Sequence, residues 1–330
     1  MLRVVIVGTG EMASSLLLGV KEAGHNVVGF FRKERVSLPD AARIFRDTFM
    51  PTDFYLLAKK YKIPEIIAKS VNSEQFRKQI RKLNADIIIV GSWGEKFSQK
   101  TILTPKLATI NCHPSLLPAY RGPNPYMATI SSGETVSGVT FHFMNEEYDK
   151  GEILAQKEVP ILPDDNGYTL KLRTVQTART LLKELLPQIE NGAVTPVAQD
   201  ENKASYFKRI THKDIYVDFS MSAVEIYNKV RGFEPWAACY LKIKKEFLKI
   251  GHAQIVNLYE DIYYVKNKKY MLPDRYLNVK EGKILAKGKD WLLCSTIEEG
   301  NAILLYDLKL YGIVKQFLTK SFIKSLKSLK

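Results

Sequence analysis

The side chains best suited to chemistry lie in one stretch, residues 111–149. It holds Asn111 and His113 close together and Asp149 after a helix-length interval, among strand-like and tight-turn segments. An amide can donate to a developing oxyanion, an imidazole can stabilise charge or move a proton, and a carboxylate can orient the imidazole. This set suits acyl transfer to a neutral nucleophile. It needs no Ser or Cys nucleophile when the attacking group is itself an amine.

The pattern of residues 1–200 predicts the elements that position these side chains. Short, β-branched segments alternate with helical patterns, which predicts an α/β domain with a Rossmann-like, mainly parallel sheet covered on both faces. In such a sheet the site lies at the carboxyl ends of the strands. The predicted strands are 2–7, 27–31, 85–90 and 108–112, followed by 139–144 and 152–161, whose antiparallel direction stays open; the predicted helices include 11–23, 73–84 and 168–191.

The second part of the chain has a different rhythm. We expect a catalytic domain over 1–200, a polar linker over 201–219 and a second domain over 220–330. The second domain begins with a short helix, for which Ser220 or Ser222 is a plausible N-cap. About five short strands then follow, separated by turn residues, which fits a small β-barrel. The closing residues 314–330 indicate a basic amphipathic helix or a frayed tail.

The net charge of +14 is spread unevenly along the sequence. Residues 201–330 hold 24 Lys/Arg and 14 Asp/Glu, a net charge of +10, which leaves +4 for residues 1–200. A basic domain favours a polyanionic partner such as RNA. A lysine-rich, solvated surface explains the same composition, because the lysines are scattered among the predicted strands.

Composition also limits the compartment and the kind of site. The three cysteines lie far apart without a CxxC pair, which favours a reducing cytoplasm over a disulfide framework or a zinc ribbon. No apolar run approaches the length that spans a bilayer, and residues 1–7 fit a first strand better than a signal peptide. No His, Cys, Asp and Glu cluster has ligand spacing, so we expect no metal.

Three short sequence features could each belong to a functional site or to ordinary structure. Gly8-Thr9-Gly10 follows the first predicted strand, but no acidic residue ends the second one, so we interpret it as a tight turn rather than a dinucleotide site. His142 lies in the middle of a predicted strand, and we interpret it as part of one strand face. Asp149 precedes Lys150-Gly151, so by spacing alone it is either a turn residue or a site residue.

A longer motif favours the interpretation of Asp149 as a site residue. The run Asn111-Cys112-His113-Pro114-Ser115-Leu116-Leu117-Pro118, followed by Asp149-Lys150-Gly151, resembles the signature of the folate-dependent formyltransferases. Those enzymes move a formyl group from 10-formyltetrahydrofolate to an amine. The segment 230–236 (VRGFEPW) resembles the entry to that family's C-terminal OB-like barrel. The resemblance covers essentially the whole chain and implies this two-domain plan.

The resemblance implies roles for individual residues. Asn111 and His113 would hold the oxyanion, and Asp149 would orient His113 or relay a proton. The folate would lie against Val90, Gly91, Ser92, Trp93, Met144 and Tyr148, and the acceptor would face Tyr120, Arg121 and Asn124, with no metal involved.

The acceptor stays open between two alternatives. The amino group of methionyl-tRNA, bound through the basic C-terminal domain, fits the two-domain plan. A small amine, such as a nucleotide-linked amino sugar, is favoured by the segment 30–54, which carries Arg32, Lys33, Arg35, Arg43 and Arg46 but lacks the Gly-Lys run of the tRNA enzymes and is predicted to be partly helical. The segment 122–125 (GPNP) also departs from those enzymes. A non-catalytic RNA-binding relative is disfavoured, because the three catalytic positions are intact.

Overall fold

The computed structural model describes the chain except for residues 33–39, 261, 273–279, 313–315, 317 and 327–330. The chain forms two compact units. The first comprises residues 1–125, 136–160 and 170–208, and the second comprises residues 126–135, 161–169 and 209–330. Two short segments from the first half of the chain therefore belong to the second unit. The continuous domain limits taken from the sequence stay a prediction.

A six-stranded sheet forms the centre of the first unit, in the order β2-β1-β3-β4-β5-β6. Strands β2, β1, β3 and β4 are parallel, whereas β5 and β6 are antiparallel to their neighbours. This confirms the predicted α/β fold and resolves the direction of the two later strands. The strands are β1 (Arg3–Gly8), β2 (Asn26–Arg32), β3 (Ile87–Gly91), β4 (Ala108–His113), β5 (Val136–Phe143) and β6 (Ile153–Pro160).

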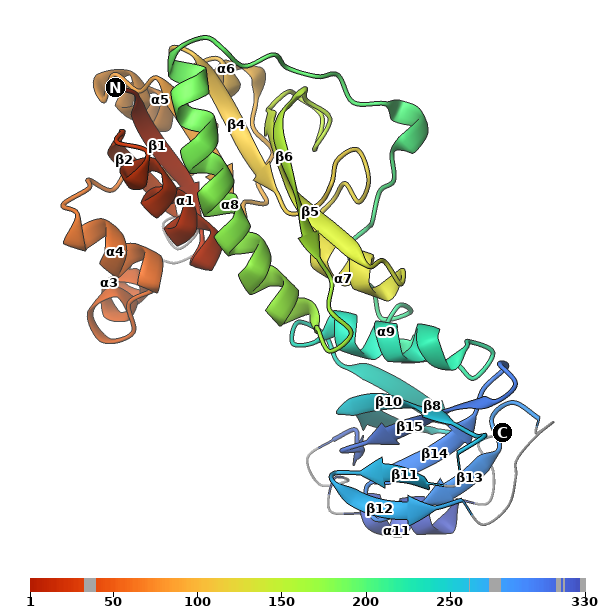
Figure 1. Ribbon diagram of the computed structural model, residues 1–330. Helices are drawn as coiled ribbons and strands as arrows, with labels where there is room; N and C mark the ends of the chain where they lie inside the picture. The colour runs from red at the N-terminus through yellow and green to blue at the C-terminus, as the bar shows by residue number, and fades with distance from the viewer. Residues whose placement is uncertain (33–39, 261, 273–279, 313–315, 317, 327–330) are drawn as a thin grey trace. The chain divides into compact units, whose positions relative to one another are not determined.

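Helices cover both faces of this sheet. On one face α1 (Gly10–Glu22) packs beside the long α8 (Gly167–Glu190), and the Ser15 hydroxyl donates to the Val175 carbonyl at 2.7 Å (Figure 1). On the other face, side chains of α5 (Glu74–Lys82) and α6 (Gln99–Ile102) pack against Val5, Val7, Ile88 and Val90. The other helical segments described in this unit are α3 (Asp40–Phe49), α4 (Asp53–Lys60) and the 3₁₀ turn η1 (Glu201–Lys203). Helix α7 (Pro125–Ser131) belongs to the second unit from residue 126 onward.

The Gly8-Thr9-Gly10 segment forms the turn from β1 into α1, as interpreted from the sequence. Gly10 has a φ of +61°, which a residue with a side chain rarely adopts. A Cβ atom on Gly8 would lie 2.2 Å from the Gly91 carbonyl oxygen of the neighbouring strand. Close backbone packing therefore explains Gly8, and the positive φ explains Gly10, without a bound dinucleotide.

The second unit is small and β-rich, as predicted, although about five strands was too few. Its described residues form a four-stranded sheet β10-β15-β14-β13, a pair β11-β12 and a four-stranded sheet β16-β9-β8-β7. Left-handed residues such as Lys244 and Asn267 close tight turns that the sequence pattern did not separate. The strands are β7 (Tyr216–Val217), β8 (Cys239–Ile243), β9 (Glu246–Ile250), β10 (His252–Asn257), β11 (Ile262–Val265), β12 (Lys268–Met271), β13 (Ile284–Lys287), β14 (Trp291–Ser295), β15 (Asn301–Tyr306) and β16 (Lys309–Leu310).

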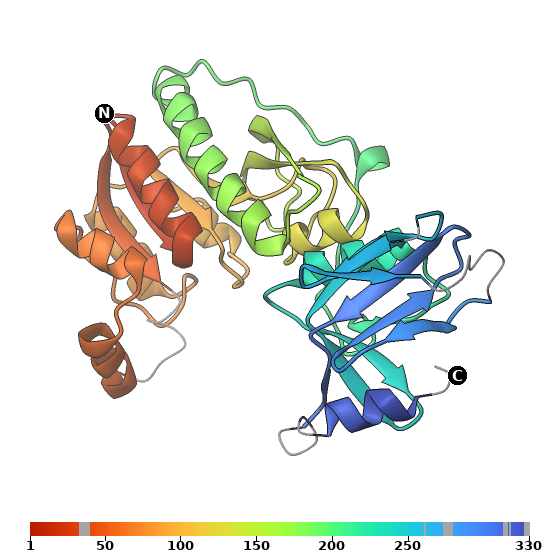
Figure 2. The same cartoon turned by 60° about the horizontal axis from the view of Figure 1, so that its bottom comes forward.

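Helices α9 and α11 join α7 in the described part of this unit. Helix α9 (Ala223–Phe233) is capped by Ser222 rather than Ser220, and Glu225 closes a capping box with it. Helix α11 (Thr319–Ser325) supplies Ile323 to the same core as α9 and is visible beside the strands in Figure 2. It confirms the closing helix in part, since other residues of 314–330 lie outside the described ranges. No described helix is long and apolar enough to cross a membrane.

Candidate active site

Strand pairing brings the first site residues together at the carboxyl end of β4. Asn111 and His113 are two residues apart on β4, so their side chains leave the same face of the sheet. The antiparallel strand β5 places His142 opposite Asn111 and Thr140 opposite His113. The Thr140 hydroxyl donates to the Ser115 carbonyl at 2.7 Å and accepts from the Leu117 amide at 3.1 Å. These bonds fix the loop that follows His113.

A tight turn after β5 presents Asp149. Asp149 has a φ of +57°, and its main-chain carbonyl, like that of Gly151, accepts from the Gln199 side-chain amide at 2.7–2.8 Å. A Cβ atom on Gly151 would lie only 1.7 Å from the Phe143 carbonyl oxygen, so only glycine fits there. Asp149 is therefore a turn residue, and its role as a site residue stays a prediction.

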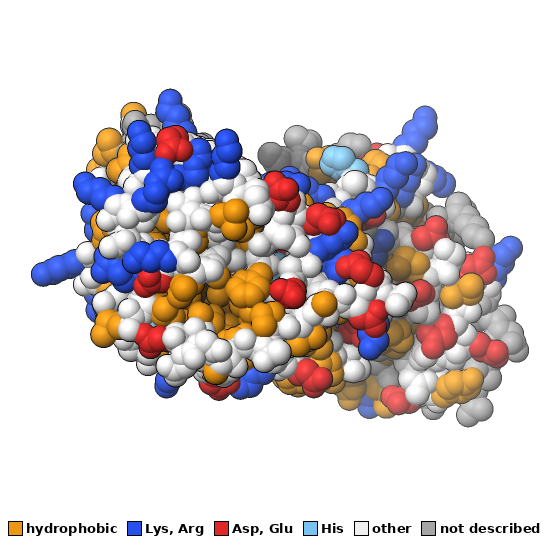
Figure 3. All heavy atoms as spheres, turned by 90° about the horizontal axis from the view of Figure 1, so that it is seen from above, with side chains coloured by type: hydrophobic (Ala, Val, Ile, Leu, Met, Phe, Trp, Pro, Cys, Tyr) orange, Lys and Arg blue, Asp and Glu red, His pale blue; other side chains and the backbone are white. Residues whose placement is uncertain are grey.

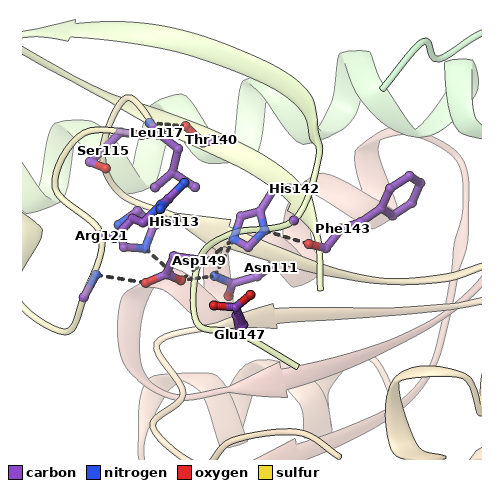
Figure 4. A network of polar contacts seen from close by, with 12 residues as sticks. Asn111, His113, Ser115, Leu117, Arg121, Thr140, His142, Phe143, Glu147 and Asp149 are labelled. Atoms are coloured by element: carbon purple, nitrogen blue, oxygen red, sulfur yellow. Dashed lines mark hydrogen bonds and ion pairs between the residues drawn. The ribbon is translucent and has the colours of Figure 1, made fainter. Parts of the chain in front are cut away.

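The Asp149 carboxylate is the centre of the polar network (Figure 4). One oxygen accepts from the Gly122 amide at 2.9 Å. The other lies 3.4 Å from Asn111 Nδ2 and 3.5 Å from His113 Nδ1. The Asp149 side chain is 12% exposed and that of His113 is 6% exposed, so these contacts are little screened by water. The structure thus brings together the three predicted catalytic residues.

The hydrogen-bond partners of His113 indicate which ring nitrogen carries a proton. Its Nε2 lies 2.9 Å from the Tyr120 carbonyl oxygen, which can only accept, so Nε2 carries a proton and donates. The Nδ1 atom then faces the Asp149 carboxylate. The Tyr120 carbonyl therefore holds one ring nitrogen of His113, and the other ring nitrogen is directed at a carboxylate.

His142 lies on one face of β5, as interpreted from the sequence, and it also belongs to this network. Its Nδ1 donates to the Phe143 carbonyl at 2.8 Å, so Nε2 accepts from Asn111 Nδ2 at 3.1 Å. Burial lowers the pKa of His142 to about 4, although the nearby Asp149 charge opposes this shift. His142 is thus neutral near pH 7. In 139–144 His142 alternates with Phe141 and Phe143. This alternation is the sequence signal for a polar side chain on the sheet face that it shares with Asn111.

The partners of Asn111 fix the orientation of its amide. Nδ2 donates toward two acceptors, His142 Nε2 at 3.1 Å and Asp149 at 3.4 Å. The flipped amide would instead turn its oxygen toward a lone pair and a carboxylate, which is unfavourable. The longer contact to Asp149 is the weaker one, so this N–H is the donor that an incoming oxyanion can take over.

A pocket opens beside this network, lined in part by Asn111, His142 and Asp149. Of the predicted folate-binding residues, Val90, Trp93, Met144 and Tyr148 line it, together with Glu95, Lys96, Phe97, Asn145 and Glu147. Gly91 and Ser92 do not line it. Among the described residues, the buried indole N–H of Trp93 has no hydrogen-bond acceptor. The pocket lining therefore combines apolar and polar side chains, which suits a flat, polar-edged ligand.

The residues predicted to face the acceptor have mixed surroundings. Arg121 is 4% exposed, and its guanidinium donates to Gln199 and to the Glu201 carboxylate at 2.7–3.1 Å. Arg121 thus anchors the segment that holds the Asp149 turn. Tyr120 and Asn124 are half-buried and lie outside the pocket lining. Contact of these three residues with an acceptor stays a prediction.

The basic segment 30–54 is partly helical, as expected, but Arg32 does not face outward. It is completely buried, where it pairs with Asp47 at 2.5 Å and with Glu65 at 2.9 Å. The Tyr55 ring covers it at 4.2 Å. Arg32 thus binds α3 to the sheet. Lys33 and Arg35 lie outside the described residues, as does the side chain of Arg43.

Comparisons with known proteins agree with this geometry. A family model described as formyl transferase matches residues 2–186, and the model of its C-terminal domain matches residues 209–312. The methionyl-tRNA formyltransferase of Sulfurihydrogenibium sp. is 32% identical over 91% of this chain and 93% of its own length. That of Thermotoga maritima is 34% identical over 73% of this chain and 76% of its own length.

Solved structures with the same fold are more distant in sequence. An N-formyltransferase from Helicobacter canadensis, in complex with folinic acid and dTDP-3-aminofucose, superposes with a TM-score of 0.66 at 19% identity. The match covers 93% of this chain and 99% of that one. Since family models match most of the sequence and relatives above 30% identity span most of it, the chain belongs to the formyl transferase family.

Proposed function

We propose that this protein transfers the formyl group of 10-formyltetrahydrofolate to a primary amine. The observation that carries the proposal is the convergence of Asn111, His113 and Asp149 beside a pocket with an unused Trp93 N–H donor. The folinic acid bound by the Helicobacter canadensis relative supports a folate in that pocket. None of the steps below needs a metal ion or a protein nucleophile.

The amine nitrogen attacks the formyl carbon, and the carbonyl electron pair moves to oxygen. The Asn111 N–H that faces Asp149 and the protonated His113 donate to this oxyanion. The attacking nitrogen loses a proton to the Asp149 carboxylate. The bond from the formyl carbon to the folate nitrogen then breaks, and that nitrogen takes up the proton that Asp149 received. The products are a formamide and tetrahydrofolate.

The amino group of methionyl-tRNA is the acceptor that the charge distribution favours. Residues 59–107 contain 11 Lys/Arg and 4 Asp/Glu, a net charge of +7, whereas the rest of residues 1–200 contain 14 and 17, a net charge of −3. Exposed basic side chains gather on α5 and α6, in the part of the first unit seen at the left of Figure 3. With the +10 of residues 201–330 they suit a polyanion. The relatives named methionyl-tRNA formyltransferase also support methionyl-tRNA as the acceptor.

A nucleotide-linked amino sugar is the second candidate. The relative solved with dTDP-3-aminofucose and the absence of a Gly-Lys run in 30–54 favour it. The free, buried state of Cys112, Cys239 and Cys294 supports placing either reaction in the cytoplasm.

A competition assay separates the two acceptors. The protein is given 10-formyltetrahydrofolate with equal amounts of methionyl-tRNA and dTDP-3-aminofucose, and each product is quantified. We expect formyl-methionyl-tRNA, with KM rising steeply between 50 and 200 mM salt because several phosphates are held. Formylation of the sugar alone would overturn the tRNA assignment, and formylation of neither amine would overturn the proposed function. Asn111→Ala is the inactive control.

A further inference from the structure

The outer face of the β16-β9-β8-β7 sheet has an unusual composition. Alternation along these strands sends Val217, Leu241, Leu248 and Leu310 into the core of the second unit. The alternate positions point the other way. They are Tyr216 on β7, Tyr240 and Lys242 on β8, Phe247 and Lys249 on β9, and Lys309 on β16. We call these residues, with Tyr311, the aromatic face.

Four aromatic rings lie on this face in two pairs. The rings of Tyr216 and Phe247 are 5.6 Å apart, and those of Tyr240 and Tyr311 are 5.9 Å apart. The Tyr311 amide donates to the Phe247 carbonyl at 2.8 Å, so Tyr311 continues the sheet beyond β16. Tyr311 is 65% exposed, and the other three rings are half-buried. The sheet backbone therefore holds these rings in place while it leaves ring surface open to solvent.

Lysines fill the positions between the rings. Lys242, Lys249 and Lys309 are exposed, and Lys244 and Lys245 extend the charge through the β8–β9 turn. Within the described part of the chain, none of the five forms an ion pair with a carboxylate. Three carboxylates lie near these lysines. Asp218, beyond β7, accepts from the Ser220 amide at 2.9 Å, Glu246 begins β9, and Glu281 lines a pocket with Tyr216 and Lys242. Lys242 also lies 5.9 Å from the centre of the Phe247 ring. The five lysines outnumber the three carboxylates, so the face has a net positive charge.

We propose that the aromatic face binds unpaired nucleotides of an RNA. Bases stack on exposed aromatic rings whatever their sequence, and interleaved lysines hold the phosphates. A protein partner fits less well, because lysine is depleted in the centres of protein interfaces. The inference rests on the proposed function in one respect: a tRNA acceptor would supply the RNA. Binding itself does not depend on catalysis.

The test uses the full-length protein and a fluorescein-labelled oligouridylate, with affinity measured by anisotropy at several salt concentrations. Loss of one stacked base costs about 1–3 kcal/mol, so Tyr311→Leu should weaken binding at least about fivefold, whereas Tyr311→Phe should retain it. Lys249→Gln should reduce the slope of log affinity against log salt by about 0.7. The controls, Tyr264→Leu on β11 and Lys268→Gln on β12, alter other exposed side chains of the same unit and should change nothing.

Each outcome decides the proposal. No binding by the wild-type protein, or equal binding by wild type and Tyr311→Leu, overturns it. Equal losses in Tyr311→Leu and Tyr264→Leu also overturn it, because the effect would then be general. The catalytic assignment is tested apart from this: Asn111→Ala should bind the oligonucleotide normally and transfer no formyl group. Failure of either proposal therefore leaves the other measurable.

Discussion

His142 should act by holding Asn111, and removing its acceptor nitrogen tests this directly. In His142→Leu the Asn111 N–H that now lies 3.1 Å from Nε2 would be buried without that partner. Leaving a buried donor unsatisfied costs about 1–3 kcal/mol. If the amide rotates to recover this energy, the oxyanion loses its donor. We therefore expect kcat/KM for formyl transfer to fall about 5-fold to 150-fold.

A matched substitution separates the hydrogen bond from the loss of volume. His142→Gln keeps an acceptor oxygen near the same place, so its kcat/KM should stay within a few-fold of wild type. The Asn111→Ala background provides a second control. There His142→Leu should have little further effect, because two residues that act as a unit are not additive. Full activity of His142→Leu, or additive losses in the double variant, would refute the positioning role.

Three further predictions concern stability. Burial lowers the pKa of His142 from its usual value to about 4, so between pH 6.5 and 4 the unfolded chain binds a proton that the folded chain does not. The free energy of unfolding should therefore decrease by about 3 kcal/mol as the pH falls through this range. Denaturant titrations of His142→Gln should show a smaller decrease. Gly151→Ala should destabilise the protein and abolish transfer, because its Cβ would meet the Phe143 carbonyl, whereas Gly94→Ala, with open space around it, should melt as wild type. Ser222→Ala should lower the free energy of unfolding by about 1 kcal/mol through loss of the α9 cap, and an equal loss in Ser220→Ala would contradict the cap assignment.

What the sequence predicts here depends on how local the determinants are. Asn111 and His113 lie two residues apart at one strand end, so a short motif contains their geometry. The role of His142 depends on the register between β4 and β5, which pairs it with Asn111 across 31 residues. The burial of Arg121 depends on Glu201, 80 residues away. The alternation of His142 with Phe141 and Phe143 indicates only which sheet face it occupies, and no local pattern marks the Arg121 contact, so sequence reasoning missed both contacts.

The same distinction applies to the fold. Continuous apolar strands and amphipathic helices identify the parallel sheet, because burial on both faces leaves a strong pattern. The second unit has short strands joined by turns with left-handed residues such as Lys244 and Asn267. A lysine in the sequence does not predict such a turn. Its strand number was therefore underestimated, although its β-rich class was correct.

The most direct test of the central claim is a single-turnover measurement with methionyl-tRNA and 10-formyltetrahydrofolate. We predict that wild type releases tetrahydrofolate and formyl-methionyl-tRNA in equal amounts. Asn111→Ala should slow both about 100-fold to 1,000-fold, the usual effect of losing one oxyanion donor. Folate turnover without a formylated amine, or an unchanged rate in Asn111→Ala, would contradict formyl transfer at this site.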